Sequence, residues 1–267
     1  AKSKTQFLAP KPRPQPQLLP PPHPLPQRQP RRSPSARLTS KPTFPAWLPA
    51  GGRLADARLD RAGEGRYEIR SRRLDRSGAE QTLYSSERQA FLWDWSPDGR
   101  RLVYTDDRDS ELWLLPLADG AKPIAFTSSP EVDDCAQFSP DGRWVAYTSN
   151  QSGRYEVYVR PFPGPGPSKL ISTAGGITPR WRKDGEELYY IAPDGAMMGV
   201  PISMKAGALD RGVPAELFKT RIVGAGRPVT INFNYDVAAD GRFLINVVTA
   251  EVPASPLTLL LKWKPKP

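Results

Sequence analysis

Short apolar runs alternate with turn-forming residues along most of the chain, and this pattern repeats. The segment that starts at Trp95 reads W-S-P-D-G-R-R-L-V-Y, and a close copy starts at Phe138. A weaker copy starts at Trp181, so successive copies are 43 residues apart. Proline fixes φ, aspartate can accept hydrogen bonds from the amides that follow it, and glycine tolerates a positive φ. Each copy therefore predicts a tight reversal between two antiparallel strands.

Two more copies and a second motif extend the repeat. A fourth copy starts at Val237, and a degenerate one starts at Trp47, where Ala50 replaces the aspartate. The second half of the unit also recurs, as Y-E-I-R-S, S-E-L-W-L and Y-E-V-Y-V. Because two independent features recur at nearly the same spacing, the chain is a repeat protein with five visible units.

Each unit has room for four strands. In the unit led by Trp95, apolar residues predict a strand that ends there and further strands near 102–104, 112–117 and 123–127. Four antiparallel strands in about 43 residues are typical of a β-propeller blade, and blades must stack to bury their faces. We therefore predict an all-β propeller of four-stranded antiparallel blades. The five repeats either close a ring themselves or belong to a six-bladed ring. We expect a final strand near 257–263 to join strands preceding Trp47 and so seal the ring.

The charge is unevenly distributed. The net charge is +10, yet residues 1–45 hold nine basic residues, no acidic residue and 13 of the 32 prolines. We predict that residues 1–41 form a disordered, basic, proline-rich tail and that residues 42–267 form the propeller. Such a tail is either a solvated linker or a segment that docks on SH3-like grooves, phosphates or anionic lipid. Since the excess charge belongs to the tail, nucleic acid is not a favoured partner.

The W-S-P-D-G-R copies resemble the bacterial WD40-like (PD40) propellers, the group that includes the TolB propeller. The C-terminal part resembles the end of the propeller that some bacterial serine/threonine protein kinases carry after a membrane span. The resemblance lies in the order of three segments, Glu216–Phe218, Tyr235–Asn246 and Pro256–Trp263. The resemblance implies a non-catalytic sensor or protein-interaction domain of a kinase-type receptor, in an extracytoplasmic or periplasmic location. The chain itself lacks kinase motifs, because its single histidine, His23, leaves no H-R-D loop.

Two other functions fit the same resemblance. One is a TolB-like periplasmic scaffold with an envelope protein as partner. The other is the propeller of an S9-type peptidase, which would need a hydrolase domain after Trp263, and the chain ends four residues later. No G-x-S-x-G elbow with a histidine base is present, so we expect no enzyme activity and no cofactor from this chain.

Neither the single cysteine nor the acidic clusters predict a reactive site. Cys135 follows Asp133 and Asp134, which raise a thiol pKa, so we interpret it as a packed structural residue. Asp106, Asp107, Asp109 and Glu111 do not have the spacing of an EF-hand, and we expect a solvated loop and no metal. No apolar stretch approaches the ~20 residues of a membrane span.

Binding is expected on the loops of one face. In propellers, the loops between second and third strands and the connections to the next blade open on the same face, and function concentrates on such loops. Charged or amide side chains there could reach a protein or peptide, a small polar ligand or a glycan. Their mixed signs disfavour a phosphate backbone. The candidate residues are Glu87, Arg88, Asp107, Arg108, Asp133, Asp134, Asn150 and Arg154.

Overall fold

The computed structural model describes residues 43–48, 52–59, 66–75, 77–107, 111–128, 130–205, 208–222 and 235–246. These residues form strands and turns and contain no helix, so none of them provides the long apolar helix that a membrane crossing needs. The predicted tail and the predicted sealing strand near 257–263 lie outside the described residues, and the boundary at residue 41 stays a prediction.

Two complete blades come first along the chain. Blade 1 contains β1 (Thr43–Trp47), β2 (Arg53–Leu59), β3 (Tyr67–Arg73) and β4 (Gln81–Ser86). Blade 2 contains β5 (Ala90–Trp95), β6 (Arg101–Asp106), β7 (Trp113–Pro116) and β8 (Ile124–Ala125). In both sheets each strand pairs antiparallel with the next strand of the chain. The four strands predicted for the unit at Trp95 are thereby confirmed.

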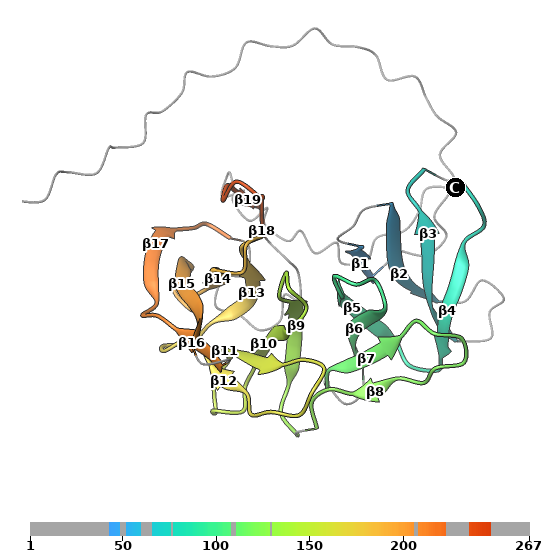
Figure 1. The fold of residues 1–267 in the computed structure, drawn as a ribbon, viewed down its shortest axis with the longest axis horizontal. Coiled ribbons are helices and arrows are strands. Elements are labelled where there is room, and N and C mark those ends of the chain that lie inside the picture. The colour runs from blue at the N-terminus through green and yellow to red at the C-terminus, as the bar shows by residue number, and fades with distance from the viewer. Residues whose placement is uncertain are drawn as a thin grey trace, which may run out of the picture. The chain divides into compact units, whose positions relative to one another are not determined.

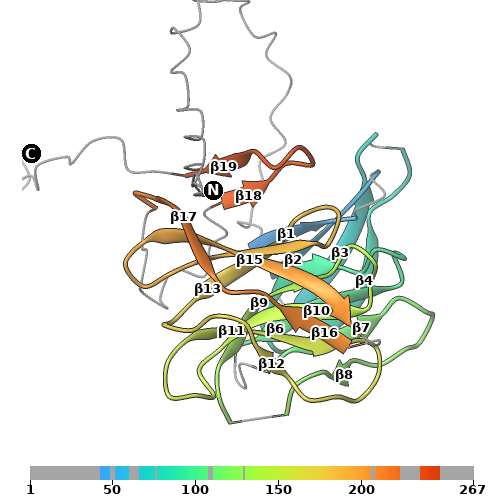
Figure 2. The same ribbon diagram turned by 60° about the vertical axis from the view of Figure 1, so that its left-hand side comes forward.

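The later repeats follow the same order with one elaboration. Blade 3 contains β9 (Asp133–Phe138), β10 (Trp144–Ser149), β11 (Glu156–Pro161) and β12 (Lys169–Leu170). Blade 4 contains β13 (Ile177–Trp181), β14 (Glu187–Ile191), β15 (Ala196–Lys205), β16 (Ala208–Arg211) and β17 (Ala215–Lys219). The long strand β15 pairs with β17 over its first half and with β16 over its second half (Figure 2). The fifth repeat is described as the hairpin of β18 (Tyr235–Val237) and β19 (Phe243–Ile245).

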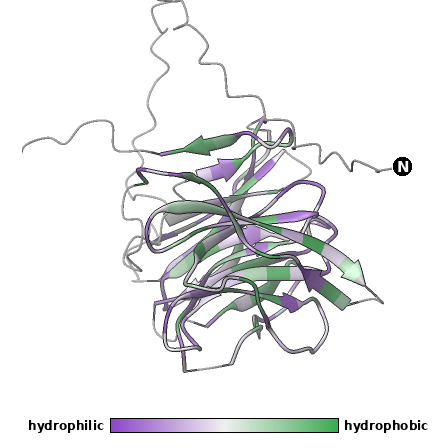
Figure 3. Cartoon of the chain, turned by 90° about the vertical axis from the view of Figure 1, so that its left-hand side faces the viewer, coloured by the Kyte–Doolittle hydropathy of each residue, from purple (hydrophilic) through white to green (hydrophobic). Residues whose placement is uncertain are grey.

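The first strands of successive blades lie next to one another, β1 by β5, β5 by β9 and β9 by β13 (Figure 1). This arrangement of four-stranded antiparallel blades confirms the predicted all-β propeller class. Along the strands, hydrophobic and hydrophilic residues are interspersed, as expected for sheets that bury their faces against neighbouring sheets (Figure 3).

The repeated turn has the geometry that its residues predict. In blade 2 the Ser96 hydroxyl accepts a hydrogen bond from the Arg101 amide at 2.9 Å and donates to the Asp98 carboxylate at 2.6 Å. Asp98 also accepts from the amide of Arg100, and Gly99 has φ of +70°. Equivalent bonds recur around Asp141, Asp184 and Asp240. These recurring aspartates shape the turn.

Aromatic residues at the ends of the first strands fill the spaces between blades. Trp95 packs against blade 1, and Phe138 packs against blade 2. Trp181 packs against blade 3 in the same way. All three side chains are buried, so each contributes about 2–3 kcal/mol of hydrophobic stabilisation to the stacking of blades.

A β-bulge interrupts the first strand of each of blades 1 to 4 at the same place. In blade 3 the register shifts between Asp134 and Gln137, and in blade 4 it shifts between Ile177 and Arg180. Cys135 and Thr178 lie inside these two bulges with φ of 52° and 53°. A residue in the left-handed region changes the direction of the side chains on either side of it. The first strands therefore do not follow the simple alternation of inward and outward side chains.

Candidate binding site on the loop face

The predicted site residues that the structure describes lie at one end of the blades, which we call the loop face. It comprises the described parts of the connections between second and third strands and of the connections from one blade to the next, namely 87–89, 107, 111–112, 126–128, 130–132, 150–155, 171–176 and 192–195, together with the strand ends beside them. The opposite end, which carries the W-S-P-D-G turns 96–100, 139–143 and 182–186, is the turn face.

A groove of about 480 Å³ lies between blades 1 and 2 and reaches the loop face at Arg88. Its volume is within the range of ligand-binding pockets. We call it the Arg88 groove. Its main lining side chains are Tyr84, Arg88, Tyr104, Asp106, Trp113 and Lys122.

The Arg88 guanidinium is held in place but still reaches solvent. It donates to Asp106 Oδ2 at 2.9 Å, and the Arg88 amide donates to Ser86 Oγ at 3.0 Å. The Arg88 side chain is 35% exposed, whereas that of Asp106 is 9% exposed. Because the guanidinium is a planar fork with five N–H donors and the side chain is partly exposed, a ligand in the groove can approach it from solvent.

Aromatic residues complete this groove. Burial and the nearby Tyr84 and Asp106 raise the pKa of Tyr104, so its phenol stays neutral and can donate a hydrogen bond. The Trp113 indole nitrogen is buried and has no hydrogen-bond partner among the described residues. With the exposed Lys122 at the edge, the groove combines two cations and several donors with aromatic surface. This combination suits a carboxylate on an apolar stem.

A second, smaller pocket of about 210 Å³ surrounds Arg154 between blades 3 and 4. Arg154 donates to Glu156 Oε1 at 2.6 Å and to the Thr173 carbonyl at 3.1 Å, and its side chain is 61% exposed. Glu156 is 1% exposed and also accepts from Gly175 N and the Ser172 hydroxyl. Arg154 therefore ties two loops together and covers a buried carboxylate.

The other predicted residues have different surroundings. Asn150 Oδ1 accepts a hydrogen bond from the Val132 amide at 2.8 Å, which connects the loop at 150–155 with the loop that precedes β9. Asp133 is 2% exposed, and burial together with the charge on Asp133 raises the pKa of Asp134 to about 7. Glu87 and Asp107 are exposed, and Arg108 lies outside the described residues. Arg88 and Arg154 line different pockets, so the predicted residues do not converge on one site.

Cys135 agrees with its structural interpretation. It is free and 4% exposed. Burial and the neighbouring Asp134 raise its thiol pKa well above the ordinary value, which makes it a poor nucleophile. Among the described residues, no three His, Cys, Asp or Glu side chains gather as a metal site requires.

In blades 2, 3 and 4, the residue directly before the recurring aromatic of the first strand is polar, and none of these three residues was among the predicted site residues. Asp94 Oδ2 accepts from the Phe138 amide at 3.0 Å, and Gln137 Oε1 accepts from the Trp181 amide at 2.7 Å. Arg180 follows, with its Nε 4.0 Å from Asp236 Oδ1. Each side chain reaches the next blade. Their shared position in the repeat was the signal that could have identified them.

Curated relatives match only part of the chain. The Tol-Pal system protein TolB of Anaeromyxobacter dehalogenans is 31% identical over 126 residues, which cover 45% of this chain and 28% of that protein. Tricorn protease homolog 1 of Streptomyces coelicolor is 35% identical over 102 residues, which cover 37% of this chain and 9% of that protein. The chain thus spans less than half the length of these curated relatives. No family model matches the chain.

Solved structures support the fold. TolB from Acinetobacter baumannii superposes with a TM-score of 0.52 and 18% identity over 76% of this chain and 53% of that one. Oligogalacturonate lyase from Vibrio parahaemolyticus superposes with a TM-score of 0.55 and 12% identity over 77% of this chain and 62% of that one. Together with the sequence relatives, these neighbours support a PD40/TolB-type β-propeller. Because an enzyme shares the fold, the fold alone does not decide the function.

Proposed function

We propose that this chain is a non-catalytic, TolB-like propeller that binds a partner protein on its loop face. The observation that carries the proposal is the Arg88 groove, whose guanidinium is anchored by Asp106 at 2.9 Å and remains partly exposed. An acidic side chain or a terminal carboxylate of the partner fits this chemistry. The alignment with TolB over 126 residues favours an interaction scaffold as the general role.

The kinase-linked function remains a second hypothesis that rests on sequence motifs alone. It predicts a kinase domain encoded upstream of this chain, whereas the TolB-like scaffold predicts an exported precursor. The similarity to TolB favours the scaffold, and an extracytoplasmic location belongs to both proposals. Reading the full coding sequence separates them.

Site-specific photo-crosslinking in the native host tests the scaffold proposal. A photoreactive residue at Lys122, on the edge of the Arg88 groove, should capture one defined partner. The same residue at Val213, which is 83% exposed and lies outside the groove, is the control. The proposal predicts a crosslink from position 122 that is lost in an Arg88→Glu background. Equal capture from both positions, or no capture, contradicts it.

A further inference from the structure

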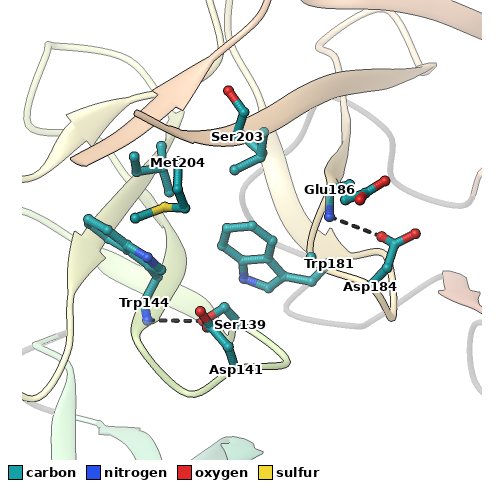
Figure 4. Close-up of a pocket in the computed structure, with 11 residues that line it drawn as sticks. Ser139, Asp141, Trp144, Trp181, Asp184, Glu186, Ser203 and Met204 are labelled. Atoms are coloured by element: carbon teal, nitrogen blue, oxygen red, sulfur yellow. Dashed lines mark hydrogen bonds between the residues drawn. The ribbon is translucent and has the colours of Figure 1, made fainter. Parts of the chain in front are cut away.

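A second groove lies on the turn face between blades 3 and 4. It measures about 500 Å³, and its main lining residues are Asp141, Trp144, Trp181, Glu186, Ile202 and Met204. Figure 4 shows the rings of Trp144 and Trp181 on two sides of the pocket, with Asp141 between them and Met204 at the opposite edge. We call it the tryptophan groove.

Both indole groups in this groove have an unused hydrogen-bond donor. Trp144 Nε1 and Trp181 Nε1 are buried and have no hydrogen-bond partner within the described ranges. Trp181 as a whole is 6% exposed. Since a buried donor without an acceptor costs about 1–3 kcal/mol, a ligand that brings carbonyl oxygens is favoured here.

The rim of the groove is acidic. Asp141 accepts from Ser139 Oγ at 2.5 Å and from the Arg143 amide at 3.0 Å, but it has no ion pair with a described cation. Asp184 and Glu186 also line the groove, and Arg182 compensates part of their charge through contacts of 2.8 and 3.1 Å. The unpaired carboxylate is therefore that of Asp141.

The preceding pair of blades shows what is missing beside Asp141. There the repeat places Asp98 where blade 3 has Asp141, and Arg101 where blade 3 has Trp144. The Arg101 guanidinium lies 3.6 Å from Asp98 Oδ2 and 5.4 Å from the centre of the Phe162 ring. One cation thus satisfies the aspartate and stacks on an aromatic face. In blade 3, tryptophan replaces this arginine and leaves both the carboxylate and a pocket.

We propose that the tryptophan groove binds an arginine side chain from an extended segment of a partner protein. The guanidinium lies against the indole faces and pairs with Asp141, as Arg101 pairs with Asp98 one blade earlier. Backbone carbonyls of the same segment accept from the two indole N–H groups. This site is on the turn face and is independent of the Arg88 groove, so either proposal can fail without the other.

The test follows the indole N–H signals of the 15N-labelled chain during titration with the peptide Ac-Ala-Arg-Ala-Arg-Ala-NH2. Substituting single tryptophans assigns the signals. Signals of Trp144 and Trp181 should move and saturate, whereas those of Trp95 and Trp113, which are also buried without partners, should not. The peptide with citrulline in place of arginine keeps the shape but removes the charge, and it should bind at least about fivefold more weakly.

Three variants complete the experiment. Asp141→Asn keeps an acceptor for the turn but removes the charge, and it should weaken binding about fivefold. Asp98→Asn, the matched change one blade earlier, should leave binding unchanged. Trp181→Phe places at this position the residue that Phe138 provides in the preceding repeat, and it should also weaken binding. Unmoved Trp144 and Trp181 signals, equal binding of the citrulline peptide, or full affinity of Asp141→Asn overturns the proposal.

Discussion

Asp94 and Asp98 are four residues apart, yet their surroundings shift their pKa values in opposite directions. Burial raises the pKa of Asp94 to about 6, even though the Phe138 amide donates to it. Hydrogen bonds from Ser96 and from the Arg100 amide lower the pKa of Asp98. Asp94 therefore connects two blades, but its burial disfavours the charged carboxylate. Asp98 stabilises a turn in its charged form.

Replacing Asp94 by asparagine should change the pH dependence of stability. Asp94 binds its proton more tightly in the folded chain than in the unfolded chain, so its stabilising contribution is lost as the pH rises from about 4 through 6. An asparagine in its place would keep an acceptor for the Phe138 amide without this loss. Between pH 4 and pH 8, Asp94→Asn should gain about 2–3 kcal/mol relative to the wild type.

Urea unfolding at several pH values measures this difference. Asp98→Asn is the control with the opposite sign, since the contribution of Asp98 is present at neutral pH and is lost as the pH falls through its lowered pKa. A stability difference between Asp94→Asn and wild type that does not depend on pH would contradict the assignment of a raised pKa to Asp94.

A glycine in the repeated turn gives a second prediction at this scale. Gly142 has φ of +68°, and a Cβ there would lie 3.7 Å from Pro97 of the neighbouring blade, an ordinary contact. Gly142→Ala should therefore destabilise the chain by about 1–2 kcal/mol through backbone strain alone. Gly164→Ala, at a position with open space and no positive φ, should change the midpoint of thermal unfolding much less. Equal effects would exclude strain as the cause.

One side chain connects the first strands of blades 2 and 3, and one connects those of blades 3 and 4. Gln137 Oε1 accepts from the Trp181 amide at 2.7 Å, in the same repeat position as Asp94 and the Phe138 amide. Gln137→Leu leaves that amide without its partner and should cost about 1–3 kcal/mol. Gln137→Glu, which restores an acceptor, should recover part of the loss. Denaturant unfolding measures the cost, and faster hydrogen exchange at Trp181 in Gln137→Leu locates it at this contact.

Local chemistry explains how much of each blade could be predicted. The turn at Asp98 depends on neighbours within five residues, so the sequence predicts both the reversal and the strands beside it. The bulge at Cys135 and the double pairing of β15 depend on how a strand meets the rest of its sheet. Neither leaves a pattern within one repeat.

The candidate sites were harder to predict, because they form where two blades meet. Arg88 was identified as a charged loop residue, but Tyr84 comes from the outer strand of blade 1 and Lys122 comes from the far end of blade 2. Trp144 and Trp181 belong to different repeats, and their unpartnered N–H groups become visible only when the blades are stacked. The sequence did carry one signal of this groove: blade 3 has Trp144 where blade 2 has Arg101.

At the scale of the whole molecule, the blades present two separate grooves, which we propose as binding surfaces. The Arg88 groove on the loop face carries cations, and the tryptophan groove on the turn face carries carboxylates. Surfaces of opposite charge at opposite ends of the strands can bind different partners at once. This arrangement supports the proposed interaction scaffold.

The most direct test of this account is the affinity of the crosslinked partner, once purified, for wild-type and variant chains. Titration calorimetry should show at least a tenfold loss of affinity in the Arg88→Glu, Lys122→Glu double variant, whose charge reversal repels a carboxylate. The Asp141→Asn chain, altered on the turn face, is the matched control and should bind the loop-face partner normally. Unchanged affinity in the double variant would contradict the central claim that this propeller binds its partner through the Arg88 groove.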